Sequence, residues 1–98
     1  MNINIEKENG ITLMKLEGRL DTTTAPELEK AINNEGEALK SLVLDFKDVD
    51  YISSAGLRVL LTAQKKMNIQ GQMELNNVSE AVMDIFEMTG FADILVIK

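Results

Sequence analysis

Two adjacent serines, Ser53 and Ser54, are the residues of this chain best suited to carry a regulatory modification. They follow an apolar stretch with an acidic end, and they open a segment of helical periodicity that begins Ser54-Ala-Gly-Leu57. A hydroxyl at the start of a helix lies where backbone N–H groups point outward and negative charge is favoured. A phosphate on one of these serines would therefore be stabilised by the helix. Either serine also fits an ordinary N-cap, because serine is among the residues preferred there.

The sequence offers no group that would make Ser54 a hydrolytic nucleophile. The chain contains no histidine and no cysteine, which removes the usual general base near neutral pH and the commonest metal ligand. It also lacks a P-loop, a GxGxxG dinucleotide motif and zinc-ligand spacing. We therefore expect a protein that is not an enzyme, with no catalytic residue, no cofactor and no metal ion. A nucleotide-binding or nucleotide-hydrolysing enzyme is the least favoured interpretation, because no residue offers a catalytic base.

Gly56 stands in the first turn of the helix that follows the serines. A glycine there costs about 1 kcal/mol relative to alanine, so its missing side chain should serve a purpose. One interpretation is the close approach of a partner, a kinase or a phosphate. The other is tight packing of the helix against a neighbouring strand or helix. The sequence leaves both open.

Carboxylates cluster just before the serines, at Asp45, Asp48 and Asp50. A response-regulator receiver also has an aspartate after a central strand, but it needs an acidic pair after its first strand. The corresponding segment here is Lys7-Glu-Asn9. We therefore predict that these aspartates occupy a solvated turn rather than a metal or phospho-acceptor site. Asp21, which ends the segment Gly18-Arg-Leu-Asp21, is interpreted from its position alone as a turn residue or helix-entry cap.

Length and composition limit the classes of function that remain. The chain has 98 residues, is 45% hydrophobic and 27% charged, and carries a net charge of −6. These values fit one globular domain over residues 1–98, and the charge disfavours nucleic acid or an anionic membrane while allowing a basic protein partner. No signal peptide and no apolar run of about 20 residues is visible, so we expect a cytoplasmic protein without a membrane segment.

The first half of the chain predicts a hairpin, a helix and a buried strand. Asn9-Gly10 separates two alternating segments, Ile3–Glu8 and Ile11–Glu17, as in a two-residue hairpin. Thr24 and Glu27 have capping-box spacing at the start of a helix that should end before Gly36. Ser41–Phe46 is a nearly unbroken apolar run, typical of a central strand covered on both faces.

The second half continues the alternation of helix and strand. A helix is predicted over Ser54–Met67, and a strand follows at Gln72–Asn76. Ser79 should cap a third helix that stops at Gly90, and Ile94–Ile97 is predicted as a last strand. The predicted fold class is α/β with the order ββαβαβαβ, a mixed sheet and crossover helices.

Three motifs of the chain resemble the STAS domains of bacterial anti-sigma factor antagonists. They are Gly18-Arg-Leu-Asp21, Leu42-Val-Leu-Asp-Phe46 and Tyr51-Ile-Ser-Ser-Ala-Gly-Leu57. Ala81–Met88 followed by Thr89-Gly-Phe91 is similar to the same family, so the resemblance covers essentially the whole chain. It implies a single STAS-like domain.

The resemblance implies a partner-switching function. In that family an unphosphorylated antagonist binds an anti-sigma factor that is also a serine kinase, and this releases the sigma factor. The kinase phosphorylates the serine two residues before the motif glycine, and a metal-dependent serine phosphatase removes the phosphate. That serine is Ser54 here, with Ser53 as the less favoured acceptor, and a monomer or weak dimer is expected. The implied partner-binding residues are Asp21, Thr22, Ser53, Ser54, Ala55, Gly56, Leu57 and Arg58.

Two departures from the family pattern qualify this interpretation. Many members carry aspartate immediately before the acceptor, where this chain has Ser53, a competing hydroxyl without charge. Many also continue beyond the position of Lys98 into a final helix, and its lack would expose apolar surface to a partner or a second copy. The alternative function keeps the fold: a STAS regulatory subunit of a transporter or signalling scaffold that is not phosphorylated.

Overall fold

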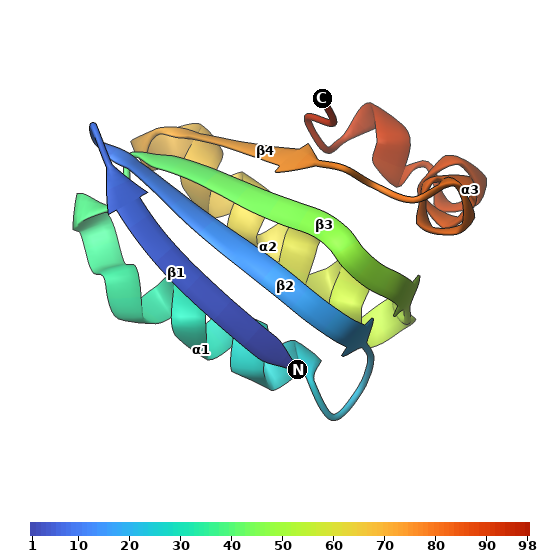
Figure 1. Cartoon of the computed structure of the whole chain (residues 1–98). Helices are drawn as coiled ribbons and strands as arrows, with labels where there is room; N and C mark the ends of the chain where they lie inside the picture. The colour runs from blue at the N-terminus through green and yellow to red at the C-terminus, as the bar shows by residue number, and fades with distance from the viewer.

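The computed structural model describes all residues 1–98 and shows a four-stranded sheet with helices packed against it (Figure 1). The strands lie in the order β1-β2-β3-β4. The elements are β1 Asn2–Glu8, β2 Ile11–Leu20, α1 Ala25–Glu35, β3 Ser41–Ile52, α2 Ser54–Gln70, β4 Gln72–Asn76 and α3 Glu80–Thr89. Two short 3-10 helices, η1 (Gly36–Ala38) and η2 (Phe91–Asp93), complete the chain. No helix is long and apolar enough to cross a membrane.

Strand pairing confirms the predicted mixed sheet. β1 pairs antiparallel with β2, while β2–β3 and β3–β4 are parallel. The hairpin turns at Asn9 (φ 53°) and Gly10 (φ 80°), and two positive φ angles are what a tight two-residue hairpin requires. The helices α1 and α2 are the crossovers that return the chain to each parallel strand.

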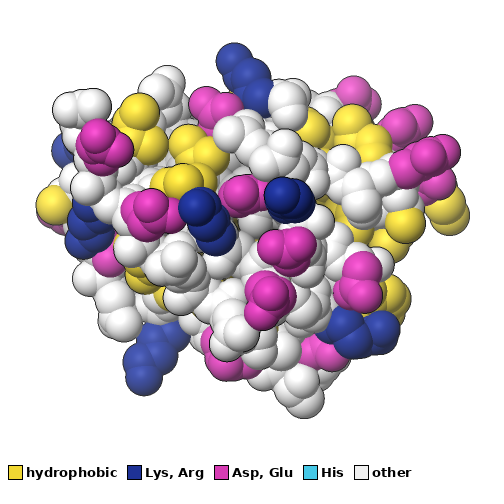
Figure 2. Space-filling view, in the orientation of Figure 1, with side chains coloured by type: hydrophobic (Ala, Val, Ile, Leu, Met, Phe, Trp, Pro, Cys, Tyr) yellow, Lys and Arg dark blue, Asp and Glu magenta, His cyan; other side chains and the backbone are white.

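The core lies on one face of the sheet. Leu42, Leu44 and Phe46 alternate along β3 and are fully buried, whereas Val43 between them is only half-buried. α1 and α2 lie side by side against this face (Figure 1), and α3 reaches it through Phe86, whose ring centroid is 6.3 Å from that of Phe46. The other face is open and carries charged side chains (Figure 2). The expectation that β3 is covered on both faces is therefore wrong.

β3 is longer than predicted and changes the place of the aspartates. It runs to Ile52 because β2 continues to Leu20 and keeps pairing with it across two register shifts. Asp45, Asp48 and Asp50 therefore lie in the strand, not in a solvated turn. Asp45 accepts hydrogen bonds from the Lys47 backbone N–H (2.9 Å) and the Asn77 side-chain amide (3.0 Å). No group of three or more acidic, histidine or cysteine side chains is arranged to hold a metal ion.

The predicted last strand is reduced to a single bridge. Ile97 pairs in parallel with Leu75 of β4, through one hydrogen bond from the Leu75 N–H to the Val96 carbonyl and one from the Lys98 N–H to the Leu75 carbonyl (2.9 Å each). η2 ends at Asp93, directly before the predicted segment, and Ile94, the first residue of that segment, has a helical backbone (φ −97°, ψ −42°). The order ββαβαβα is confirmed, and the eighth element is a bridge at the outer edge of β4.

Candidate functional site

The two serines have different structural roles at the junction between β3 and α2. Ser53 has an extended backbone, and its Oγ accepts a hydrogen bond from the Gly56 N–H at 3.4 Å, which makes Ser53 the N-cap of α2. The Ser53 N–H donates to the Leu20 carbonyl at 2.9 Å and ties this junction to the end of β2. Ser54 is the first residue of the helix and is exposed. The N-cap interpretation therefore applies to Ser53 and leaves the Ser54 hydroxyl facing solvent.

Gly56 is buried, and packing explains its missing side chain. A Cβ atom at this position would lie 2.8 Å from Cγ of Leu20, 2.9 Å from Cγ1 of Ile52 and 2.9 Å from the Leu20 carbonyl oxygen. Contacts below 3.0 Å require neighbouring atoms to move. Of the two interpretations of Gly56, the structure supports close packing of α2 on the ends of β2 and β3. Leu57 is also buried, so it supports the site from the core side.

Asp21 organises the loop between β2 and α1. Its Oδ1 accepts hydrogen bonds from the Thr23 hydroxyl (2.8 Å), the Thr23 N–H (3.0 Å) and the Thr24 N–H (3.1 Å). The hydrogen bond from the Thr23 hydroxyl, together with those from the backbone, lowers the pKa of the Asp21 carboxyl below its ordinary value of 3.8. The interpretation of Asp21 as a turn residue at the helix entry is confirmed.

The capping box predicted at Thr24 is absent. Thr24 is the N-cap residue of α1, but its side chain makes no capping hydrogen bond. Its Oγ1 instead accepts from the Asp21 N–H at 2.8 Å and donates to the Arg19 carbonyl. The reciprocal bonds of a capping box do not form, because Asp21 Oδ1 already accepts from the Thr24 N–H and the Glu27 N–H donates to the Thr24 carbonyl at 2.9 Å. Pro26, the second residue of the helix, has no N–H to donate.

Arg19 is a site residue that sequence reasoning did not single out. Its guanidinium lies 4.1 Å from the centroid of the Tyr51 ring, and its Nε is 3.8 Å from Oδ2 of Asp21. Arg19 and Tyr51 are paired across β2 and β3 just after a register shift. An aromatic ring attracts a cation placed over its face, so this contact stabilises the pairing of the two strand ends that precede the candidate site. The motif Gly18-Arg-Leu-Asp21 was visible in the sequence, but the shifted pairing with Tyr51 was not.

Three of the predicted partner-binding residues line one groove. Thr22 lies on the loop before α1, and Ala55 and Arg58 lie on α2, around an open groove of about 290 Å³. Ser54 directly precedes Ala55 in α2 but does not itself line the groove. The exposed members of the predicted set therefore face solvent around the start of α2, whereas Gly56 and Leu57 lie beneath them.

The candidate site is therefore an exposed serine at the start of a helix, beside a loop held by Asp21. Comparison with known sequences identifies the family of this chain. A model of the STAS domain family matches residues 2–98. The chain belongs to the STAS domain family. The anti-sigma-B factor antagonist of Bacillus subtilis is 35% identical to this STAS domain over 99 residues, which cover 97% of the chain and 90% of the relative. The anti-sigma-B factor antagonist of Listeria monocytogenes is 34% identical over 106 residues, which cover 100% of the chain and 90% of the relative.

Solved structures share the same fold. An anti-sigma factor antagonist from Mycobacterium paratuberculosis has a TM-score of 0.85 at 24% identity and covers 98% of the chain, with 83% of that structure matched. SpoIIAA in its unphosphorylated form has a TM-score of 0.76 at 16% identity, covering 99% of the chain and 87% of that structure. The phosphorylated form of SpoIIAA has a TM-score of 0.76 at 17% identity, covering 99% of the chain and 91% of that structure. These similarities confirm the predicted STAS fold.

Proposed function

We propose that this STAS domain is an anti-sigma factor antagonist controlled by phosphorylation of Ser54. In this proposal the unphosphorylated form binds an anti-sigma factor serine kinase in the cytoplasm, and the sigma factor is released. The kinase then phosphorylates Ser54 and loses its partner, and a serine phosphatase restores the binding form. The protein is a substrate of both enzymes and is not itself a catalyst. Relatives named anti-sigma-B factor antagonists, similar over nearly the whole chain, support this function.

The division of roles between Ser53 and Ser54 carries the proposal. Ser54 is exposed and takes no part in the cap, so a kinase can modify it without breaking a bond of the fold. A phosphate there lies at the positive end of α2, which favours it by about 0.3–1 kcal/mol. Modification of Ser53 would disturb the hydrogen bond from the Gly56 N–H, and losing an N-cap costs about 1 kcal/mol. The geometry therefore favours Ser54 as the acceptor.

The expected size of the switch follows from the chemistry of the added group. A phosphoserine adds about −1.5 to −2 charges and three acceptor oxygens. A partner surface shaped for the neutral Ser54 hydroxyl would meet this dianion at the centre of the contact. Mispairing a central interface residue costs roughly 2–4 kcal/mol, which is about 30- to 1000-fold in affinity. No refolding of the STAS domain is needed for binding to be lost.

The test compares Ser54→Ala and Ser54→Glu with a matched Ser53→Ala variant. Incubation with the purified anti-sigma-type serine kinase of the source organism should label the wild type and Ser53→Ala, but neither Ser54 variant. Ser54→Ala should bind the kinase, and Ser54→Glu should not. Phosphate found on Ser53 in the wild type would overturn the assignment of the acceptor. Equal binding of both Ser54 variants to transporter or scaffold proteins would replace the phosphorylation switch with the regulatory-subunit function.

A further inference from the structure

The helix α2 has a charge opposite to that of the rest of the chain. Between Ser54 and Gln70 it carries Arg58, Lys65 and Lys66 and no acidic residue. The whole chain has a net charge of −6, so a helix of +3 leaves −9 on all other residues. The net charge suggests a basic partner, but the helix that begins at the candidate acceptor presents a local positive surface.

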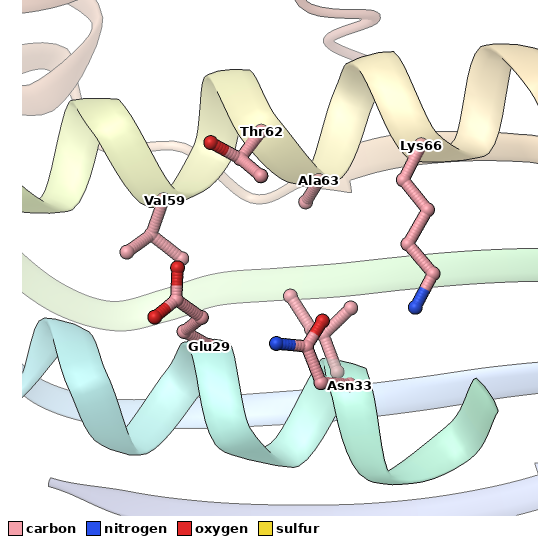
Figure 3. A pocket seen from close by; sticks show the side chains of 7 residues that line it. Glu29, Asn33, Val59, Thr62, Ala63 and Lys66 are labelled. Carbon is pink, nitrogen blue, oxygen red and sulfur yellow. The ribbon is translucent and has the colours of Figure 1, made fainter.

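A groove with an apolar floor runs between α1 and α2. It begins at Thr22 and Ala55 beside Ser54 and continues along the helices to Ala63 and Lys66. Val59 on its floor is only 8% exposed. Figure 3 shows the narrow end, a hollow of about 20 Å³, where Lys66 extends from α2 toward α1 and Glu29 extends from α1 toward α2.

The two rims of this α1–α2 groove differ in charge. Arg58 and Lys66 belong to the α2 rim, while Glu29 is the charged residue of the α1 rim. Lys65 is exposed on the same helix but does not line the groove. A ligand that fits would place apolar groups on the floor and acidic groups against α2.

We propose that the α1–α2 groove binds an acidic segment of the protein partner that recognises Ser54. This inference rests on the proposed function, because Ala55, which lines the groove, directly follows that serine in α2. The apolar floor suits side chains of a protein segment, and the basic rim gives it complementary charge. An extended polyanion such as nucleic acid or an anionic membrane is disfavoured, since it would also face the net −9 outside α2.

The groove gives phosphorylation of Ser54 a second effect. Ser54 and Arg58 are four residues apart on α2, a spacing at which helix side chains are neighbours. A phosphate on Ser54 would attract the Arg58 guanidinium and withdraw it from the partner. It would also lower the charge of α2 from +3 to about +1. The acidic segment would therefore lose attraction at the same time as the serine contact is blocked.

Charge-reversal variants test the groove with a control on the same helix. Arg58→Glu and Lys66→Glu reverse a charge on the rim, and Lys65→Glu makes the same change outside it. We expect the first two to weaken binding of the purified anti-sigma-type serine kinase about tenfold or more, and Lys65→Glu less than about threefold. Glu29→Lys should tighten binding by about threefold. Calorimetric titration at two salt concentrations measures these changes, and circular dichroism of each variant checks its fold.

The outcomes separate this inference from the proposed function. If Lys66→Glu and Lys65→Glu weaken binding equally, only the overall charge of α2 matters and the groove is not the site. If the rim variants bind like wild type while Ser54→Glu does not bind, the groove is wrong and the phosphorylation switch stands. If wild type binds a DNA duplex or phosphatidylglycerol vesicles and Lys66→Glu does not, the groove takes a polyanion and the inference is overturned. Equal kinase binding by Ser54→Ala and Ser54→Glu rejects the phosphorylation switch. The groove is then still tested by whether Arg58→Glu and Lys66→Glu bind the kinase more weakly than Lys65→Glu does.

Discussion

Replacing Gly56 with alanine should destabilise the STAS domain, although alanine is the better helix former. Alanine in a helix gains about 1 kcal/mol over glycine. Against this, the new methyl would lie 2.8 Å from Cγ of Leu20 and 2.9 Å from the Leu20 carbonyl oxygen. Overpacking of a core costs about 1–3 kcal/mol. That carbonyl also accepts the hydrogen bond from the Ser53 N–H, and displacing it costs about 1 kcal/mol more.

The balance is a loss of about 1–3 kcal/mol in the free energy of unfolding. For a domain of 98 residues, each 1 kcal/mol lowers Tm by about 4–8 °C. Urea denaturation of Gly56→Ala and wild type measures the difference. Comparing Lys65→Ala with Lys65→Gly, at an exposed position of the same helix, measures helix propensity alone. A Gly56→Ala protein more stable than wild type would refute the packing argument. The glycine would then be explained by the approach of a partner, and its substitution would affect binding instead.

Three further substitutions test the local structure around the site and the far end of α2. Ser53→Ala should lower the free energy of unfolding by about 1 kcal/mol through loss of the α2 cap, measured by urea denaturation, and an unchanged midpoint would contradict the cap assignment. Asp21 has a folded pKa below 3.8, so its stabilising effect is complete above that pH and is lost as the pH falls through the folded pKa. The Tm of Asp21→Asn should therefore fall less between neutral and acidic pH than the Tm of wild type. Equal falls in Tm for the two proteins would contradict this role of Asp21. Gly71→Ala should lower the free energy of unfolding by about 3 kcal/mol or more, because its Cβ would lie 2.7 Å from the Lys40 carbonyl carbon. A Tm equal to that of wild type in a thermal melt of the variant would show that this backbone contact can relax.

The parts of the fold fixed by local chemistry could be predicted from the sequence. Asn9-Gly10 forms the hairpin because both residues tolerate a positive φ. Ser79 caps α3 by accepting from the Val82 N–H at 3.2 Å, and Gly90 ends it with φ 81°. Each of these features depends on a few adjacent residues, so no knowledge of distant contacts was needed.

The parts that depend on distant pairing could not be predicted in the same way. β3 reaches Ile52 only because β2 shifts its register twice, and no local signal marks those shifts. The same shifts bring Arg19 against Tyr51, which explains why Arg19 was missed. Apolar side chains alone predicted a strand at Ile94–Ile97, but β4 offers it only the single bridge at Leu75. For the candidate site, the serine pair was apparent from the sequence, whereas the groove between α1 and α2 required the packing of both helices.

The neutral cap at Ser53 bears directly on how a phosphate at Ser54 would act. The resemblance to STAS antagonists implies an aspartate at the position of Ser53 in many members, and an aspartate can cap a helix as well as serine does. Its charge would occupy the positive end of α2 before any phosphate arrived and would then repel that phosphate. With Ser53 the cap bond to the Gly56 N–H is kept and the helix start is uncharged until Ser54 is modified. The dipole of α2 and the nearby Arg58 are then free to respond to the phosphate alone. The substitution that weakens the family motif at Ser53 is therefore physically compatible with a switch at Ser54.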